Sequence, residues 1–295
     1  MLVSTFPPLS SRSSPPGPVV SQAQPACYLR AGCASPVTAL ENAAHGENKL
    51  AGDWTDTFFG DAWDRVVRHA HAPGQSRAEA EFIHQALRLR PGSRVLDAPC
   101  GDGRIALGLA ELGCRVVGVD SARRSIGRAR RLARASGLDV DFRLGDMRAL
   151  DVEGRMSAVV NWWSSFGYFD EETNLRLMRD FAGLTRRGGR VLIDQINRER
   201  VLRDFRESAW DEYGPVRVHV RNRWNPESER IEGVWTFTEG NERSRRRTSM
   251  RVYTPRQMER LMDKAGLGLE RLYGWIDGSE YSRGSRRMIA VGRRG

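Results

Sequence analysis

The chain has 295 residues, of which 40% are apolar, enough for one α/β domain with an elaboration or for two small domains. It contains no apolar run of membrane-spanning length, so we expect a soluble, cytoplasmic protein without a membrane partner. The formal net charge is +10, but nearly all the basic residues are arginines interleaved with acids, which is typical of a solvated surface rather than of a nucleic-acid interface.

Residues 1–50 differ in kind from the rest, because they are rich in Pro, Ser, Ala and Gly and show no helical or strand period. Such a segment buries too little apolar surface to order itself, so we expect a disordered tail. It lacks the apolar core of a secretory signal. An organelle transit peptide and a start codon assigned too far upstream both fit, and the arginine-rich, bacterial-looking body favours the second. Either way the tail is expected to be dispensable for chemistry.

The remainder, residues 51–295, is predicted to form one domain. An aromatic-rich segment at 54–67 precedes a helix at 76–89, which Pro91 and Gly92 end. Strands and helices then alternate along the chain. The predicted strands are 94–97, 115–119, 139–144, 157–161 and 190–194, and the predicted helices are 105–112, 121–135 and 171–184, with a Gly188-Gly189 turn before the last strand. This alternation indicates an α/β fold with a doubly wound parallel sheet and right-handed crossovers.

After residue 200 the period changes from helical to alternating. Apolar and polar side chains alternate at 216–221, 231–237 and 248–253, which predicts an antiparallel β-meander inserted at 207–253. Thr254 and Pro255 then provide a cap and a first residue for a helix. Two final strands, near 267–275 and 288–292, suit an antiparallel hairpin at the sheet edge.

The unit at residues 95–120 carries the chemistry. Its first strand ends in Asp97, a turn contains Gly101 and Gly103, and the next strand ends in Asp120. Glycines let a backbone approach a ligand, and an acid about twenty residues further on can accept the hydroxyls of a ribose. The pattern Gly101-x-Gly103-x-x-Ala106 also fits a loose dinucleotide fingerprint, but Asp97 would repel a pyrophosphate and attract an amino group.

The string Leu-Asp-x-x-Cys-Gly-x-Gly-Arg at residues 96–104 resembles motif I of the class I S-adenosylmethionine-dependent methyltransferases. Over residues 54–293 the chain resembles the bacterial small-molecule branch, which includes amino-sugar and lincosamide-type N-methyltransferases. The shared features are an aromatic N-terminal cap, a Ser-Phe-Gly-Tyr-Phe segment after the fourth strand, and a β-meander lid before the last helix. The resemblance implies a seven-stranded Rossmann-like sheet, a transferase activity and S-adenosylmethionine as cofactor.

On this interpretation eight residues bind the cofactor. Asp97 orients the methionine moiety, Asp120 binds the ribose, Asp146 accepts from the adenine amino group, and the others are Gly101, Gly103, Ser121, Met147 and Asn161. Met147 would pack on the adenine ring, and Asn161 would hold the cofactor's amino group at the carboxyl edge of the sheet. The alternatives are a buried acid that caps a turn for Asp97 and a plain Asx-turn for Asp146.

Two residues are candidates for catalytic contact with the acceptor. Tyr168 is expected to face the substrate, and His219 is the histidine of the lid, although a solvent-facing strand histidine is the alternative. The lid is expected to fold over the carboxyl ends of the fourth and fifth strands and to bring His219, Trp235 or Arg251 towards the acceptor. The other histidines lack partners at metal-ligand spacing, so no metal is expected.

The predicted reaction is direct in-line methyl transfer to a small molecule, at nitrogen rather than oxygen, because no residue stands out as a general base. An RNA methyltransferase is an alternative suggested by the net charge and the arginine cluster at 243–247. Against it, the fourth strand ends in Asn161-Trp162-Trp163-Ser164 rather than in Asn/Asp-Pro-Pro-aromatic, so no nucleic-acid partner is expected. An NAD(P)-dependent oxidoreductase on a similar sheet is the more remote alternative.

Overall fold

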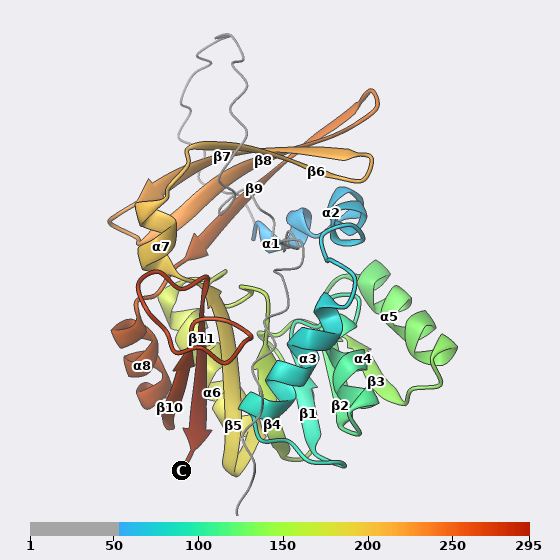
Figure 1. Cartoon of the computed structure of the whole chain (residues 1–295), viewed down its shortest axis with the longest axis vertical. Helices are drawn as coiled ribbons and strands as arrows, with labels where there is room; N and C mark the ends of the chain where they lie inside the picture. Colours follow the sequence, from blue (N-terminus) through green and yellow to red (C-terminus); the bar gives the residue numbers. More distant parts are fainter. Residues whose placement is uncertain (1–52) are drawn as a thin grey trace, which may run out of the picture.

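The structure, a computed structural model, describes residues 53–295. The predicted disordered tail at 1–50, with Cys27 and Cys33, lies outside the described residues. Figure 1 shows the described part as a central sheet with helices on its faces and a second sheet across one end of it.

The central sheet has seven strands in the order β10-β11-β5-β4-β1-β2-β3. Strands β1 to β5 pair in parallel, whereas β11 runs antiparallel to both β5 and β10. The strands are β1 (Arg94–Asp97), β2 (Arg115–Asp120), β3 (Val140–Leu144), β4 (Met156–Asn161), β5 (Thr185–Ile196), β10 (Leu267–Tyr273) and β11 (Arg287–Arg294). The predicted doubly wound α/β fold and its antiparallel edge hairpin are confirmed.

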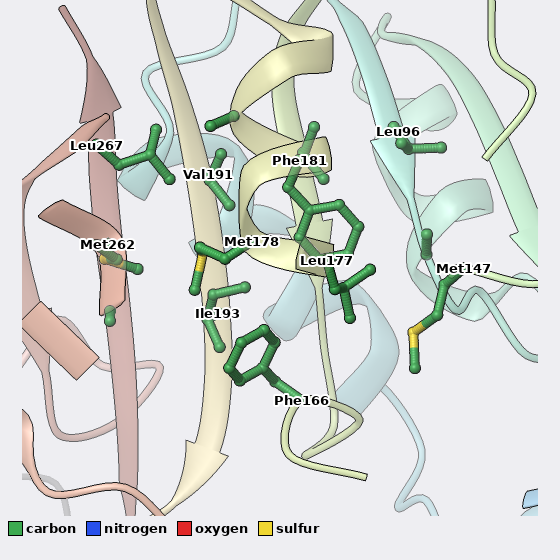
Figure 2. Close-up of a cluster of buried hydrophobic side chains, with 14 of the residues drawn as sticks. Leu96, Met147, Phe166, Leu177, Met178, Phe181, Val191, Ile193, Met262 and Leu267 are labelled. Atoms are coloured by element: carbon green, nitrogen blue, oxygen red, sulfur yellow. The ribbon is translucent and has the colours of Figure 1, made fainter. Parts of the chain in front are cut away.

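Helices cover both faces of this sheet, because each central strand is apolar on both sides. One layer contains α3 (Gln75–Ala86), α4 (Arg104–Glu111) and α5 (Arg123–Ala135), and the other contains α6 (Glu171–Leu184) and α8 (Pro255–Lys264). Figure 2 shows part of the second layer, in which α6 packs against β5 through Leu177, Met178, Phe181, Val191 and Ile193. The predicted start of α8 is present as a capping box between Thr254 and Gln257.

Strand β5 begins earlier than predicted. Gly188 and Gly189 were expected to form a turn before the strand, but they lie within it. A Cβ on Gly189 would lie 2.8 Å from the carbonyl oxygen of Ser157 and 2.6 Å from the Thr185 side chain. The glycines therefore allow a local irregularity, seen as a register shift between β4 and β5, rather than a chain reversal.

The predicted lid is a separate four-stranded antiparallel sheet in the order β6-β7-β8-β9. Its strands are β6 (Ser208–Tyr213), β7 (Val216–Asn225), β8 (Arg230–Glu239) and β9 (Glu242–Arg251), and α7 (Arg198–Arg203) leads into it. The prediction of three strands missed β6 and placed the last strand too late. Strand β9 contains the arginine cluster, whose inward positions Ser244, Arg246 and Thr248 are polar, so the sequence shows no apolar alternation there.

Two short helices, α1 (Thr55–Phe58) and α2 (Asp61–Val67), lie between the lid and the central sheet (Figure 1). They form a cap whose apolar side chains share one core with the inner face of the lid, as Phe58 and Val66 do with Val218 and Trp235. The Phe58 and Trp235 rings meet edge to face with centroids 5.4 Å apart. Cap and lid therefore act as one packed unit above the carboxyl ends of the parallel strands.

Candidate functional site

A cavity of about 500 Å³ lies between the carboxyl ends of the parallel strands and the cap. Asp97 at the end of β1, Asp120 at the end of β2 and Asp146 after β3 line one part of it, and Trp162 and Trp163 after β4 line another. In open α/β sheets this is the place where the strand order reverses and ligands bind. The order of the sheet reverses here between β1 and β4.

Asp97 is a buried acid with an open acceptor atom. It is 1% exposed, and its Oδ2 has no hydrogen-bond partner among residues 53–295. Burial raises the pKa of its carboxyl to about 8, against the opposing charge of Arg104. Once this carboxyl loses its proton, it can bind a cation such as an ammonium group, which supplies the missing partner.

The two glycines of the first turn have different surroundings. Gly101 lines the cavity with φ +56°, and a Cβ there would meet no atom within 4 Å. Gly103 does not line the cavity, because its side-chain position points into the protein core. A Cβ there would lie 2.6 Å from the Phe142 ring and 3.0 Å from Ala129. The structure therefore assigns Gly103 to the packing of α4 on α5 and β3, a correction of its expected contact with cofactor.

Asp120 ties together two backbone segments at the cavity. Its Oδ2 accepts a hydrogen bond from the Gly101 amide at 2.8 Å, and its Oδ1 accepts one from the Ala122 amide at 2.8 Å. Burial raises the pKa of this carboxyl, and the two amide hydrogen bonds oppose that rise. Ser121, between the two anchored residues, also lines the cavity. Each Asp120 oxygen keeps acceptor capacity for a ligand hydroxyl.

Asp146 and Met147 line the cavity beyond β3. The Asp146 carboxylate accepts from the Arg148 amide at 2.8 Å and from the Arg148 guanidinium at 2.9 Å, so the Asx-turn alternative is present. Although burial raises the pKa of Asp146, these Arg148 hydrogen bonds hold it below its usual value. Arg148 also pairs with Asp53. An adenine contact by Asp146 must therefore share the carboxylate with Arg148.

Asn161 lies behind the cavity wall rather than on it. The side chain is fully buried, and its Nδ2 donates to the Ala98 carbonyl oxygen at 2.8 Å. It is absent from the residues that line the cavity. The side chain of Asn161 was expected to contact the cofactor, but it instead supports the turn after Asp97. It is buried because β4 lies between β1 and β5 in the sheet.

The opposite wall of the cavity is aromatic and comes from the cap and from the segment after β4. Tyr168 is part of this wall, and its neighbours there are Phe59, Trp63, Trp163 and Phe169. The rings of Trp63 and Trp163 have centroids 5.8 Å apart, and those of Phe59 and Tyr168 also lie 5.8 Å apart. Burial raises the pKa of Tyr168 to about 12, so its hydroxyl stays protonated near neutral pH.

His219 is on the outer face of the lid, away from the cavity. Its ring stacks on Trp210 at 4.0 Å and its Nε2 lies 2.9 Å from the Ser208 hydroxyl. Because side chains alternate along a strand, Val218 and Val220 take the inner face of β7 and His219 cannot. The structure thus contradicts the expectation that His219 reaches the acceptor.

The other two lid residues expected near the acceptor are also absent from the cavity wall. Trp235 is buried in the core that cap and lid share, with its ring 5.9 Å from that of Trp63. Arg251 is held away from the cavity by Glu171 at 2.5 Å and by Glu229. The lid therefore shapes the aromatic wall of the cavity indirectly, by supporting the cap.

A buried ion pair holds the segment after β4. Trp163 and Ser164 have left-handed backbones, with φ +63° and +62°. The Trp163 amide donates to Asp194 Oδ2 at 2.8 Å, and Arg287, paired with Asp194, donates to the Ser164 hydroxyl at 2.9 Å. Asp194 and Arg287 are 1% and 2% exposed. Neither was predicted as a site residue, because nothing in the sequence relates two residues 93 positions apart.

Within residues 53–295 no group of three His, Cys, Asp or Glu side chains is arranged to hold a metal ion. No helix of the described residues has the length and apolar character needed to cross a membrane. Cys100 and Cys114 are both buried free thiols.

Residues 95–189 match the family model described as a methyltransferase domain. The chain is 42% identical over 90 residues to a ubiquinone biosynthesis O-methyltransferase of Methylocella silvestris. The aligned segment covers 30% of this chain and 33% of the relative. The chain is 27% identical over 167 residues to a glycine/sarcosine N-methyltransferase of Halorhodospira halochloris, which covers 55% and 60%. The chain thus spans less than two thirds of the length of these curated relatives.

Solved structures share the fold at low sequence identity. The CcbJ methyltransferase from Streptomyces caelestis matches with a TM-score of 0.66 at 23% identity, over 77% of this chain and 98% of that one. The sugar N-methyltransferase KedS8 from a Streptoalloteichus species matches with a TM-score of 0.60 at 22% identity, over 86% and 99%.

The central sheet, with a cavity at its switch point, has the fold of these solved methyltransferase structures, and residues 95–189 match a methyltransferase domain. The methyltransferase domain of this chain lies at residues 95–189, and S-adenosylmethionine is the cofactor bound in solved structures of this fold. The residues that line the cavity fit this cofactor. The main observation is that the buried Asp97 Oδ2, which has no hydrogen-bond partner within residues 53–295, is complementary to the ammonium group of a methionine moiety.

Proposed function

We propose that the protein transfers a methyl group from S-adenosylmethionine to the nitrogen of a small-molecule amine. The aromatic wall of the cavity carries this proposal, with Trp63, Trp163 and Tyr168 as its centre. An aromatic face stabilises a nearby cation by about 0.5–2 kcal/mol. Methylation of a neutral amine creates a cationic nitrogen, whereas methylation of an oxygen anion consumes charge, so this wall favours the nitrogen reaction.

The ionisable groups of the cavity support the same choice. A hydroxyl acceptor needs a positioned base whose pKa lies near the working pH. His71 lines the cavity, but burial, reinforced by the charge of Arg104, lowers its pKa to about 3, which makes it a weak base. A neutral amine needs no such base, because its proton can leave after the transfer.

The proposed roles of the cofactor residues follow their positions. Asp97 holds the methionine ammonium, Asp120 and Ser121 bind the ribose, and Asp146 and Met147 bind the adenine. Bound S-adenosylmethionine supplies an activated methyl group on a sulfonium leaving group. The cap and the lid exclude water and hold the acceptor in line, a contribution worth about 7–11 kcal/mol at its best. A cytoplasmic location, expected from the sequence, is part of the proposal.

Oxygen methylation is a second candidate, favoured by two observations. One relative is named as an O-methyltransferase. Asp64 lines the cavity half-buried, and burial raises the pKa of its carboxyl above its usual value, which makes it a stronger base. None of the relatives described above is named for a nucleic-acid substrate or for NAD(P), so neither of those alternatives gains support.

The test is formation of S-adenosylhomocysteine from S-adenosylmethionine with matched panels of small amines and phenols. We expect turnover with amines that rises with pH towards the pKa of each amine, since the unprotonated form reacts. Turnover with phenols alone, lost in Asp64→Asn, supports the oxygen alternative instead. Protection against thermal unfolding by NAD(P) but not by S-adenosylhomocysteine contradicts both. An RNA affinity that falls steeply with salt would support the RNA alternative.

A further inference from the structure

The arginine cluster at 243–247 has no role in the proposed function, and most of it lies on the outer face of the lid. That face looks away from the central sheet (Figure 1). Residues directly opposite one another on antiparallel strands share a face of the sheet. One such row crosses the four strands of the lid and contains Trp210, His219, Thr236 and Arg245. Because side chains alternate along β9, Arg243 and Arg247 project outward together with Arg245.

The middle of this outer face is strongly basic. Its two carboxylates, Glu212 and Glu232, pair with Arg217 and Arg223. Four further exposed arginines on the same face have no ion-pair partner within residues 53–295, namely Arg221, Arg243, Arg245 and Arg247. Many exposed arginines elsewhere do pair with a carboxylate, as Arg77 does with Glu81. The outer face of the lid therefore keeps an excess of positive charge.

The three outward arginines of β9 repel one another. Alternate residues of a strand lie about 6.7 Å apart along it. The residues opposite them on β8 are Thr238, Thr236 and Val234, which carry no charge. The excess charge is also felt on β7, where Arg221 and Arg243 add to burial in lowering the pKa of His219. Unpaired like charges destabilise the free protein, and an anionic partner relieves that repulsion.

Trp210 adds an apolar anchor to this basic face. Its side chain is 60% exposed, and its ring stacks on His219 with centroids 4.0 Å apart, which restricts its orientation. Within residues 53–295 the lid exposes no second large apolar side chain. One aromatic anchor among arginines is typical of the energetic centre of a protein–protein interface. Single-stranded nucleic acid uses several stacking rings, and a membrane surface uses several apolar anchors.

We propose that the outer face of the lid binds an extended acidic segment of a partner protein. In an extended segment, Asp or Glu side chains at alternate positions repeat every 6.7 Å or about that, the same spacing as Arg243, Arg245 and Arg247. An apolar side chain of the segment packs on Trp210. A second copy of this chain does not fit the face, because its formal net charge is +10. The inference goes beyond the proposed function, since this face is remote from the cavity.

Synthetic peptides test this surface without knowledge of the partner. The probe is a peptide of about 13 residues with Glu at alternate positions and one central Leu, long enough to follow a ten-residue strand. The reference peptide has the same composition with its Glu residues in one block. In calorimetry at low salt, the alternating peptide should bind at least about fivefold more tightly than the block peptide, and its affinity should fall as salt rises.

Variants of the lid should weaken this binding selectively. Trp210→Ala and the double variant Arg245→Glu/Arg247→Glu should each reduce the affinity about tenfold or more, as for energetically central interface residues. The matched control Arg176→Glu/Arg179→Glu on the exposed surface of α6 changes the net charge equally and should stay within about twofold of the wild type. Arg245→Glu alone places a carboxylate between two arginines, so its melting temperature should not fall, which separates lost binding from lost folding.

The same measurements can overturn the proposal. Failure of the alternating peptide to bind at low salt contradicts it, as does equal affinity for the block peptide or an equal loss in the α6 control. Tighter, Trp210-dependent binding of a thymidine oligonucleotide of equal charge assigns the face to single-stranded nucleic acid instead. Tighter binding to phosphatidylglycerol vesicles, with a blue shift in emission that Trp210→Ala removes, assigns it to a membrane surface.

Discussion

Gly101 and Gly103 lie in one turn with φ of +56° and +84°, but only Gly103 has protein atoms where a side chain would go. A left-handed residue with a Cβ costs about 1–2 kcal/mol, and overpacking adds about 1–3 kcal/mol. Gly103→Ala should therefore lose more unfolding free energy in urea than Gly101→Ala. Gly101→Ala should instead mainly weaken S-adenosylhomocysteine binding, because its methyl group enters the cavity. Equal losses of stability would contradict the different roles.

The Asp120 side chain is the most direct test of the ribose site. Asp120→Ala removes the acceptor oxygens, so S-adenosylhomocysteine affinity measured by calorimetry should fall about tenfold or more. The variant also frees the Gly101 and Ala122 amides from their shared anchor. Asp120→Asn is the matched control, since one acceptor oxygen remains, and its loss should be smaller. Unchanged affinity in the alanine variant would remove the ribose assignment.

Asp97 predicts a pH dependence of cofactor binding. Its pKa of about 8 means that the free protein holds a proton there below that pH, whereas an ammonium ligand requires the carboxylate. Binding therefore releases a proton, and S-adenosylhomocysteine affinity should rise with pH from 6 to 8, by at most about tenfold per pH unit. Asp97→Asn should bind weakly and without this rise. Calorimetry in buffers of different ionisation enthalpy measures the proton release directly.

At the scale of elements, the strands and helices that carry motif I followed directly from the sequence. Their periods are strong, and Asp97 and Asp120 mark strand ends that a local pattern can locate. Strand β9 could not be found in this way, since its inward side chains Ser244, Arg246 and Thr248 are polar and the strand is defined by its partner β8.

The candidate site was predictable only on its cofactor side. The aromatic wall depends on how the cap lies over the sheet, and the sequence gives no signal of which ring faces inward. Trp63, His71 and Arg104 were therefore not predicted as site residues, although all three line the cavity. His219 was misplaced for a related reason. The alternating pattern shows that His219 and Val218 lie on opposite faces of the lid, but not which of the two faces meets the cap.

The buried pair of Asp194 in β5 and Arg287 in β11 should connect the sheet edge to the cavity. Removal of one partner leaves an uncompensated buried charge or its protonated form, at a cost of about 3–5 kcal/mol, whereas replacement of both is far less costly. Arg287→Met should therefore destabilise the protein more than the double variant Asp194→Leu/Arg287→Met in urea unfolding. Both variants should weaken cofactor binding, since the Trp163 amide and Ser164 lose polar contacts. A double variant that is less stable than Arg287→Met would contradict the coupling.

At the scale of the whole molecule, the shared core of cap and lid decides what removal of the lid does. A lid that merely covers the acceptor would leave cofactor binding intact when residues 215–250 are replaced by a short Gly-Ser bridge. Here that deletion uncovers Phe58 and Val66 of the cap, and the cap lines the cofactor cavity through Trp63 and Asp64. We therefore expect loss of methyl transfer together with weaker S-adenosylhomocysteine binding and a lower melting temperature.

A milder variant tests the same coupling with the fold retained. Trp235→Ala empties space between lid and cap and should cost about 3–5 kcal/mol. Hydrogen exchange should then increase in α1 and α2 as well as in β8. Faster exchange confined to the lid would show that the cap is independent of it.

Trp63 and Trp163 lie close to one another and both line the cavity, so the intrinsic tryptophan fluorescence of this protein should report on the cavity. Indole emission depends on the polarity and the quenching groups around the ring, so a compound that binds in the cavity against these rings should change the intrinsic fluorescence. Trp210, which is 60% exposed on the far side of the lid, contributes a constant background. Unlabelled compound libraries can therefore be screened for the missing acceptor by emission alone, with Trp163→Phe as the reference that separates cavity binding from nonspecific quenching.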